Sequence, residues 1–370
     1  MGGVVDKALQ FTWHEAVREG LREPGFAKIL VFGVGGAGNN TVNRLMESGI
    51  IGAECVAINT DKQHIDAVHA HQKLLIGEKT TRGLGAGGNP ELGRLAIEES
   101  HEKVSALLNG VDITFIAAGM GGGTGTGAAP KIAEMAHERE SIVVGVVTMP
   151  FRHERARLIR AVEGLNQMRC VCDTVVVIDN NKLMELVPQL PINEAFAVAD
   201  SILANMVKGI TETIALPSLI NLDFADFRTI ITRGGVAIVG VGESAAPNRA
   251  EEAVRNALQC PLLDVDYEGA NGALIHVNGD ETMTLAEASR VAEIVTEAMS
   301  EEALVIWGAR VDHALTGLMR VTLVLTGVHS PQLLGGFGEV KLLDLINLEP
   351  DAGPEQVLNI DFGLYQLEEY

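Results

Sequence analysis

The sequence predicts an α/β protein with a parallel, doubly wound domain, a long central helix and a second, smaller α/β domain. Short apolar runs alternate with helical stretches from Lys28 to about Asn180. These runs are continuously hydrophobic, which is typical of parallel strands that are covered on both faces. A long helical segment then separates this pattern from a second α/β pattern. Together these observations indicate two α/β units joined by a helix.

The expected elements of the first unit follow in order along the chain. Leu9, Trp13, Val17 and Leu21 lie on one apolar stripe, which predicts a helical extension at the N-terminus. The runs that we expect to be strands are residues 28–33, 54–59, 113–118, 142–148 and 174–179.

The long helix begins close to Pro191, where Asn193 is a credible N-cap, and continues to about Leu216. After it we expect strands at residues 235–241, 272–277, 303–308 and 320–327, and helices around 248–258 and 284–299. The chain therefore divides into an extension (1–25), a first domain (26–192), the central helix (193–216), a second domain (217–330) and a C-terminal tail (331–370).

Composition argues against several classes of function. The 370 residues carry a formal net charge of -21, which does not suit a protein that grips a nucleic-acid backbone. No apolar run approaches the roughly 20 residues of a membrane span, and the N-terminus lacks a secretory signal. The cysteines at positions 55, 170, 172 and 260 have no metal-ligand spacing. We expect buried, reduced thiols in a cytoplasmic protein that does not insert into a membrane.

Glycine-rich loops are the strongest functional signal. Residues 119–127 contain six glycines and two threonines, directly after an apolar run and before a helical segment. Bare backbone amides at a helix N-terminus can converge on an anion, so this loop predicts a phosphate site. Residues 33–40 form a second such loop, and residues 82–90 form a third. The first two contain no lysine, which favours a di- or triphosphate that is bound together with Mg²⁺.

Base recognition is expected on the long helix. Phe196 and Asp200 stand four residues apart and so share one face. The ring could stack on a purine, while the carboxylate accepts two hydrogen bonds from guanine N1 and N2, which adenine does not offer. Asn180 could add a polar contact to the sugar or base. The alternative is a core phenylalanine with a solvated aspartate.

Two carboxylates beyond the helix are candidates for catalysis. Asp223 and Asp226 lie with Asn221 in an expected loop after Pro217, where they could polarise a water for attack on a terminal phosphate. Helix capping is the alternative role. A straight helix would carry this loop roughly 35 Å from the base pocket. A second molecule stacked head to tail would supply the missing half, and such contacts can build a filament.

These motifs resemble those of the tubulin/FtsZ family of cell-division GTPases, and the chain looks most similar to the archaeal members over residues 26–330. Residues 119–127 resemble the family signature, and residues 85–90 the γ-phosphate-sensing loop. The resemblance implies GTP/GDP as the ligand, with Mg²⁺ bound chiefly through the phosphates and no separate protein metal site. It implies nucleotide contacts at Gly35, Gly36, Ala37, Gly38, Asn39, Asn59, Gly87, Gly88, Gly121, Gly122, Gly123, Thr124, Gly125, Thr126, Gly127, Glu154, Arg157, Asn180, Phe196 and Asp200.

The family resemblance also implies that Asn221, Asp223 and Asp226 act as the catalytic loop that inserts into the next subunit. One loop departs from the bacterial pattern, because Arg155 and Leu158 stand where bacterial members usually have glycine and arginine. Arg155, Arg157 and Arg160 are therefore the candidates for a phosphate contact. Ser218 stands where bacterial members usually have a glycine before the catalytic loop. Residues 360–364 resemble the terminal peptide that docks on membrane tethers.

The leading hypothesis is a GTPase that polymerises head to tail, located in the cytoplasm at the mid-cell division site, with itself and a membrane-tether protein as partners. A dinucleotide-dependent oxidoreductase is the alternative, with Gly33, Gly35 and Gly38 on the pyrophosphate and Asp61 on the ribose. The oxidoreductase hypothesis gives no role to the glycine loop of residues 119–127. A relative that binds GTP without hydrolysing it is a third hypothesis, and the two aspartates of the catalytic loop argue against it.

Overall fold

The computed structural model describes residues 27–181, 188–215, 224–232, 236–258, 270–300, 302–312 and 315–328. In the first half the strands are β1 (Ile29–Val34), β2 (Ala53–Asn59), β3 (Gln72–Leu75), β4 (Ile113–Gly119), β5 (Ile142–Met149) and β6 (Thr174–Asp179). The helices are α2 (Gly35–Glu47), α3 (Lys62–Ala67), α4 (Pro90–Glu99), α5 (His101–Leu107), α6 (Thr124–His137) and α7 (Arg155–Val171).

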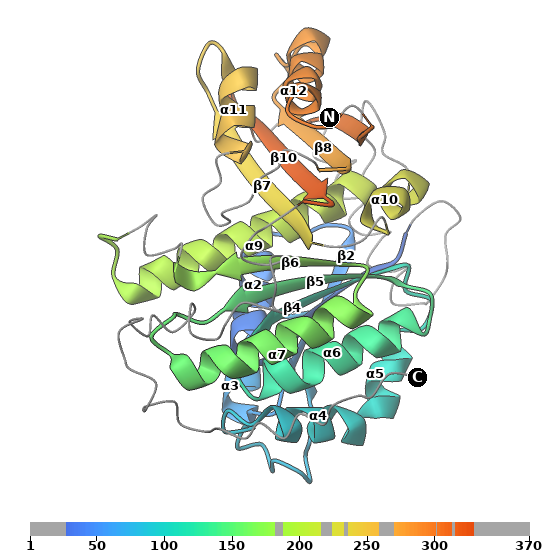
Figure 1. Ribbon diagram of the computed structural model, residues 1–370, viewed down its shortest axis with the longest axis vertical. Coiled ribbons are helices and arrows are strands. Elements are labelled where there is room, and N and C mark those ends of the chain that lie inside the picture. The colour runs from blue at the N-terminus through green and yellow to red at the C-terminus, as the bar shows by residue number, and fades with distance from the viewer. Residues whose placement is uncertain are drawn as a thin grey trace, which may run out of the picture.

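The first six strands form a parallel sheet in the order β3-β2-β1-β4-β5-β6 (Figure 1). This confirms the predicted doubly wound architecture, and all five predicted strands of this domain are present within one or two residues. Strand β3 was not predicted, because its four residues Gln-Lys-Leu-Leu are too short and too polar to give an apolar run.

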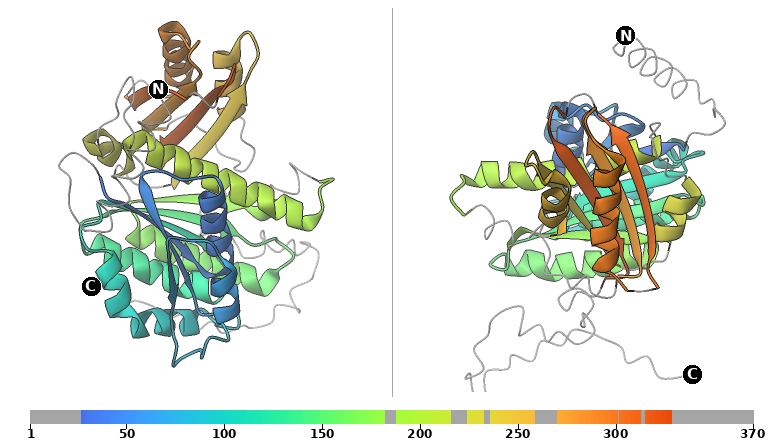
Figure 2. Two further views of the ribbon diagram at one scale, coloured as in Figure 1. Left: turned by 180° about the vertical axis from the view of Figure 1, so that it is seen from behind. Right: turned by 90° about the horizontal axis from the view of Figure 1, so that it is seen from above.

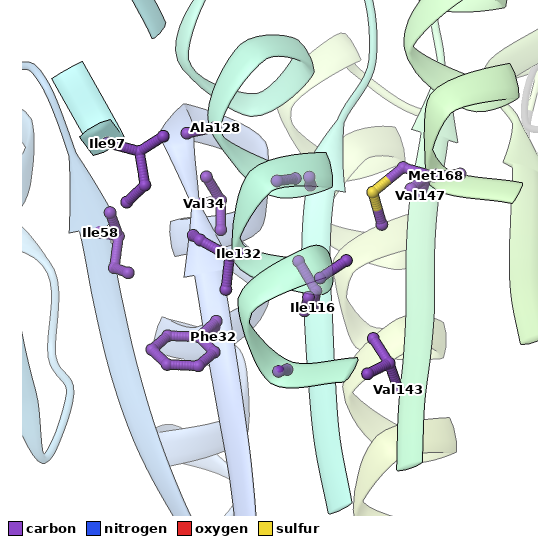
Figure 3. Packing of buried hydrophobic residues seen from close by; sticks show 14 of the residues in the cluster. Phe32, Val34, Ile58, Ile97, Ile116, Ala128, Ile132, Val143, Val147 and Met168 are labelled. Carbon is purple, nitrogen blue, oxygen red and sulfur yellow. The ribbon is translucent and has the colours of Figure 1, made fainter. Parts of the chain in front are cut away.

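Both faces of this sheet are covered, which explains the continuous hydrophobicity of its strands. On one face, alternate residues such as Phe32, Ile58 and Ile116 pack against α4, α5, α6 and α7, where Ile132 and Met168 lie (Figure 3). The residues between them on each strand pack against α2 and the central helix α9 on the opposite face (Figure 2, left).

The second half contains α9 (Ile192–Ala215), α10 (Phe224–Ile231), β7 (Val236–Ser244), α11 (Arg249–Leu258), β8 (Gly272–Gly279), α12 (Leu285–Glu297), β9 (Leu304–Val311) and β10 (Met319–Thr326). Strand β10 is antiparallel to β7 and to β8, and β8 is parallel to β9. Because β6 also pairs with β7 through two residue pairs, all ten strands form one continuous sheet. Helices α11 and α12 pack on this second part of the sheet.

The long central helix is confirmed, and it runs from the end of β6 across the molecule to α10 (Figure 1). The loop that we predicted up to Asp226 is wrong at its end, because α10 begins at Phe224 and places Asp226 in its first turn. Apolar residues Phe227, Ile230 and Ile231 recur at helical spacing and bury one face of α10. The segment is too short for this spacing to predict a helix from the sequence.

Several predicted features fall outside the described residues: the extension 1–25, the tail 331–370, and Asn221, Asp223, Ser218 and Cys260. The expectation of buried cysteines is correct for Cys55 but wrong for Cys170, which is exposed near the end of α7. Among the helices that the structure describes, none is long and apolar enough to cross a membrane.

Candidate functional site

The candidate site lies where the strand order of the first sheet reverses. From β1 the chain winds to one side through β2 and β3, and then to the other through β4, β5 and β6. Ligands of open α/β sheets bind at such a switch point, beyond the carboxyl ends of the strands. The glycine loops after β1 and β4 both occupy this place, and each leads directly into a helix, α2 and α6.

The loops after β1 and β4 touch each other through glycines. A Cβ atom on Gly35 would lie 2.9 Å from the backbone nitrogen of Gly125, and one on Gly119 would lie 2.7 Å from the Cβ of Ala37. Gly35 also has φ +74, which favours glycine. These positions admit no side chain, so the two helix N-termini are held together at the switch point.

The glycine loop of residues 82–90 closes over that of residues 119–127. A Cβ atom on Gly123 would lie 2.7 Å from the Cβ of Ala86 and 2.9 Å from the backbone nitrogen of Asn89, and one on Gly127 would lie 1.9 Å from Pro90 O. Asn89 also caps α4, since its Oδ1 accepts the N–H of Glu91 at 3.0 Å. The three loops therefore form one packed body.

Close packing changes our interpretation of the glycines in residues 119–127. We expected them to leave bare amides, but all except Gly122 would place a Cβ within 3.0 Å of a neighbouring atom. Glycine is required there mainly so that loops can approach each other. In the three loops, a Cβ would meet nothing closer than 3.8 Å at Gly36, Gly85, Gly87, Gly88 and Gly122. Gly85 faces the side chain of Asp61, and the other four positions face open space. These open positions and the two helix N-termini mark the place for an anion.

The threonines of the same loop bind protein groups. Thr126 Oγ1 accepts the N–H of Gly121 at 2.8 Å, and the hydroxyls of Thr124 and Thr60 lie 2.7 Å apart in a buried pair. Thr60 is fully buried at the end of β2. Both predicted threonines thus fix the shape of the loop through their side chains.

Asn39 is the most unusual predicted site residue. Its side chain is fully buried in α2, one turn after Gly35, and neither Oδ1 nor Nδ2 has a hydrogen-bond partner among the described residues. A buried amide without partners costs about 1–3 kcal/mol for each unsatisfied group. A polar ligand that reached Asn39 would remove that cost.

Asn59 organises the loop after β2. Its Oδ1 accepts the N–H of Thr60 at 2.9 Å and that of Asp61 at 3.3 Å, and its Nδ2 lies 3.3 Å from Nδ1 of His64. Asp61 in turn caps α3 by accepting the N–H of His64 at 3.1 Å. His64 was not among the predicted site residues, and no sequence spacing marks it.

The predicted base-binding pair lies at the first turns of α9. Phe196 is 39% exposed, and its ring contacts that of Phe151 at a centroid distance of 5.8 Å. Burial raises the pKa of Asp200 to about 6, against the opposing effect of the Arg44 charge. The ring of Phe196 is exposed and the carboxylate of Asp200 is half-buried. This is the opposite of the alternative, in which the phenylalanine is in the core and the aspartate is solvated. Asn180 lies at the end of β6, half-buried.

The arginines after β5 have different surroundings. Arg157 Nη1 pairs with Glu154 Oε2 at 2.5 Å, and Glu154 Oε1 accepts the N–H of Phe151 at 3.1 Å. Leu158 packs into the core. Arg160 donates through Nε to Gly121 O at 3.3 Å, and its Nη2 lies 3.8 Å from a Cβ built on Gly88. Arg160 therefore stands between two of the glycine loops.

The remaining predicted catalytic group is far from these loops. Asp226 is half-buried in α10, which follows the C-terminal end of α9, whereas Phe196 and Asp200 lie near its N-terminal end (Figure 1). With 24 residues, α9 is about 36 Å long. Within the described ranges, no group of three or more His, Cys, Asp or Glu side chains is arranged to hold a metal ion.

Comparisons with known proteins agree with this geometry. Residues 28–188 match the Tubulin/FtsZ family GTPase domain, and residues 235–329 match the FtsZ family C-terminal domain. The chain is 58% identical over 316 residues to cell division protein FtsZ 2 of Methanocaldococcus jannaschii, covering 85% of this chain and 83% of that protein. It is 51% identical over 311 residues to FtsZ 2 of Haloferax volcanii, covering 84% and 78%.

Solved structures give the same result. An empty FtsZ dimer from M. jannaschii matches with a TM-score of 0.79 and 49% identity, covering 85% of this chain and 91% of that one. CetZ2 of Haloferax volcanii, solved as a GTPγS-bound protofilament, matches with a TM-score of 0.72 at 22% identity, which is a likeness of fold.

Proposed function

This chain belongs to the tubulin/FtsZ family of GTPases, and on that basis we propose that it is a cell-division GTPase that polymerises head to tail and hydrolyses GTP between successive subunits. The observation that carries the proposal is the separation of the glycine loops from Asp226. The glycine loops lie at one end of α9, and the helix that holds Asp226 lies beyond the other. One molecule cannot join them, whereas two molecules stacked along this direction can.

In the proposed nucleotide site, the phosphates lie over the open positions Gly36, Gly87, Gly88 and Gly122. Guanine contacts Phe196 and Asp200, and the ribose lies by Glu154. The buried, unpartnered amide of Asn39 supports a polar ligand at this place. In the described part of the chain the loops supply amides, and no carboxylate cluster is arranged to hold a metal ion. The ligands of Mg²⁺ would therefore be chiefly phosphate oxygens, whose charge it would neutralise.

The oxidoreductase alternative has no support. Its spacing of Gly33, Gly35 and Gly38 is present, but the family of the chain is that of a GTPase. Asp61, which this alternative assigns to a ribose, instead caps α3.

The proposed function predicts that GTP turnover depends on assembly. The rate of phosphate release for each subunit should be close to zero in dilute protein and rise steeply with protein concentration, because each site needs a neighbour. Malachite-green assays across a concentration series, with light scattering in parallel, measure both quantities. A rate per subunit that does not change with concentration would refute the shared site. GTP binding without release at any concentration would favour the non-hydrolysing relative.

We infer that Arg160 faces the terminal phosphate and that Arg157 acts on the ribose side. Arg160 lies between Gly121 and Gly88, and no carboxylate pairs with it in the described part of the chain. Arg157 is paired with Glu154. The variant Arg160→Ala should weaken GTP binding about tenfold and GDP binding much less, since a charged hydrogen bond contributes about 1.5–3 kcal/mol.

Competition with a fluorescent nucleotide measures both affinities. Arg157→Ala should weaken GTP and GDP equally, and Arg155→Ala, at an exposed position, is the control. Equal losses for GTP and GDP in Arg160→Ala would contradict the assignment.

We also propose that the protein acts in the cytoplasm at the division site and is held there by a membrane-tether protein. The names of its relatives support a role in division. The segment proposed for the tether, residues 360–364, lies beyond the described residues.

A further inference from the structure

His64 lies beside the glycine loop of residues 33–40. It lies in α3, and its Nε2 atom is 4.0 Å from the Cβ position of Gly36. Apart from Gly36's own neighbours in α2, no other heavy atom of the described residues comes that close. Gly36 is exposed and is one of the open positions at the N-terminus of α2. A ligand atom placed over Gly36 would therefore meet the imidazole edge.

The hydrogen bonds of Asn59 fix which ring nitrogen carries the proton. Two backbone N–H groups, of Thr60 and Asp61, donate to Asn59 Oδ1. The amide orientation is thereby set, and its Nδ2 is the atom that faces His64 Nδ1 at 3.3 Å. Because an amide nitrogen only donates, Nδ1 must accept with its lone pair.

A neutral imidazole that accepts at Nδ1 carries its proton at Nε2. The ring therefore presents an N–H donor towards Gly36. A protonated nitrogen has no lone pair for a metal ion, so this edge is suited to an anion rather than to Mg²⁺.

We propose that His64 Nε2–H donates a hydrogen bond to a phosphate oxygen of the bound nucleotide, which makes His64 a side-chain phosphate ligand in a loop system without lysine. The proposal rests on the proposed function, because it requires a nucleotide phosphate over Gly36. Asn59 acts through His64 as a positioning residue that selects the tautomer.

The first test is the tautomer itself, in the nucleotide-free protein. Ring nitrogen chemical shifts from ¹⁵N-labelled histidine should show the Nε2–H form for His64. In Asn59→Asp, a carboxylate would accept from Nδ1, and the shifts should change to the Nδ1–H form. An Nδ1–H tautomer in the wild-type protein would overturn the proposal without reference to nucleotide binding.

The second test uses ligands that differ in phosphate. His64→Ala should weaken GDP binding about tenfold and leave guanosine binding unchanged, because one hydrogen bond to a charged oxygen is lost. His64→Gln should retain most of the affinity, since its amide can donate from a similar position. His69→Ala is the matched control, because His69 is exposed and bonds to Asn43.

The outcomes separate the two proposals. Equal weakening for guanosine and GDP, or unchanged GDP binding in His64→Ala, would overturn the role of His64. Failure of the wild-type protein to bind GDP would instead overturn the proposed function.

Discussion

Replacing Asp226 by alanine should reduce GTP turnover by at least about a hundredfold while GTP affinity stays unchanged. A group that orients or deprotonates the attacking water acts only in the transition state, so its loss lowers the rate without lowering ground-state binding. Phosphate release under assembly conditions, together with nucleotide competition on the monomer, measures the two quantities separately. A variant with near-normal turnover would exclude Asp226 from the site.

A mixing experiment tests whether Asp226 acts on the neighbouring subunit. Asp226→Ala retains its own nucleotide pocket, and Asp200→Asn retains Asp226 but should lose GTP. Each variant alone should be almost inactive with GTP. Mixed, they should recover turnover, because Asp226 of one variant can reach the GTP held by the other. If the two variants co-assembled but the mixture stayed inactive, Asp226 would not act on the nucleotide of the neighbouring subunit.

The fold was largely predictable because buried strands have a simple sequence pattern, a continuous apolar run. Strands covered on both faces need apolar residues at every position, as in β1 and β4, and such runs are unmistakable. Strand β3 lies at the sheet edge, and two of its four residues, Gln72 and Lys73, are polar and exposed, so it gives no continuous apolar run. Helix α10 is only 8 residues long, and its apolar positions resemble those of a packed loop.

The meeting of the glycine loops was predictable, but the surroundings of their residues were less so. Glycine content indicated the three loops that the structure brings together. Which glycines are open depends on contacts between segments distant in sequence, such as Gly127 with Pro90. The same holds for Arg160 and His64, which reach the loops only through the placement of α7 and α3. Sequence spacing carries no information about these contacts.

Replacing Asp200 by asparagine should exchange the base preference of the protein from guanine to xanthine. The carboxylate accepts from guanine N1–H and N2–H, whereas an asparagine amide would face N2–H with a donor. Guanine N1–H then has only a neutral acceptor and N2–H faces a donor, so GTP binding should weaken by about a hundred- to ten-thousandfold. Xanthine carries an oxygen in place of the amino group, so the side-chain amide of Asp200→Asn can donate to that oxygen, and XTP binding should improve in the variant.

The pH dependence of GDP affinity gives an independent measure of the same carboxylate. Burial raises the pKa of Asp200 to about 6 in the free protein, and guanine binds the ionised form. GDP affinity should therefore be level above about pH 6 and fall as the pH drops below it, by about tenfold between pH 7 and pH 5. The residual affinity of Asp200→Asn reports all titrating groups other than Asp200, the phosphates and His64 included, and Glu154→Gln should keep the wild-type dependence. If all three proteins showed the same profile, the titration would belong to groups other than Asp200, and Asp200 would not be the base acceptor.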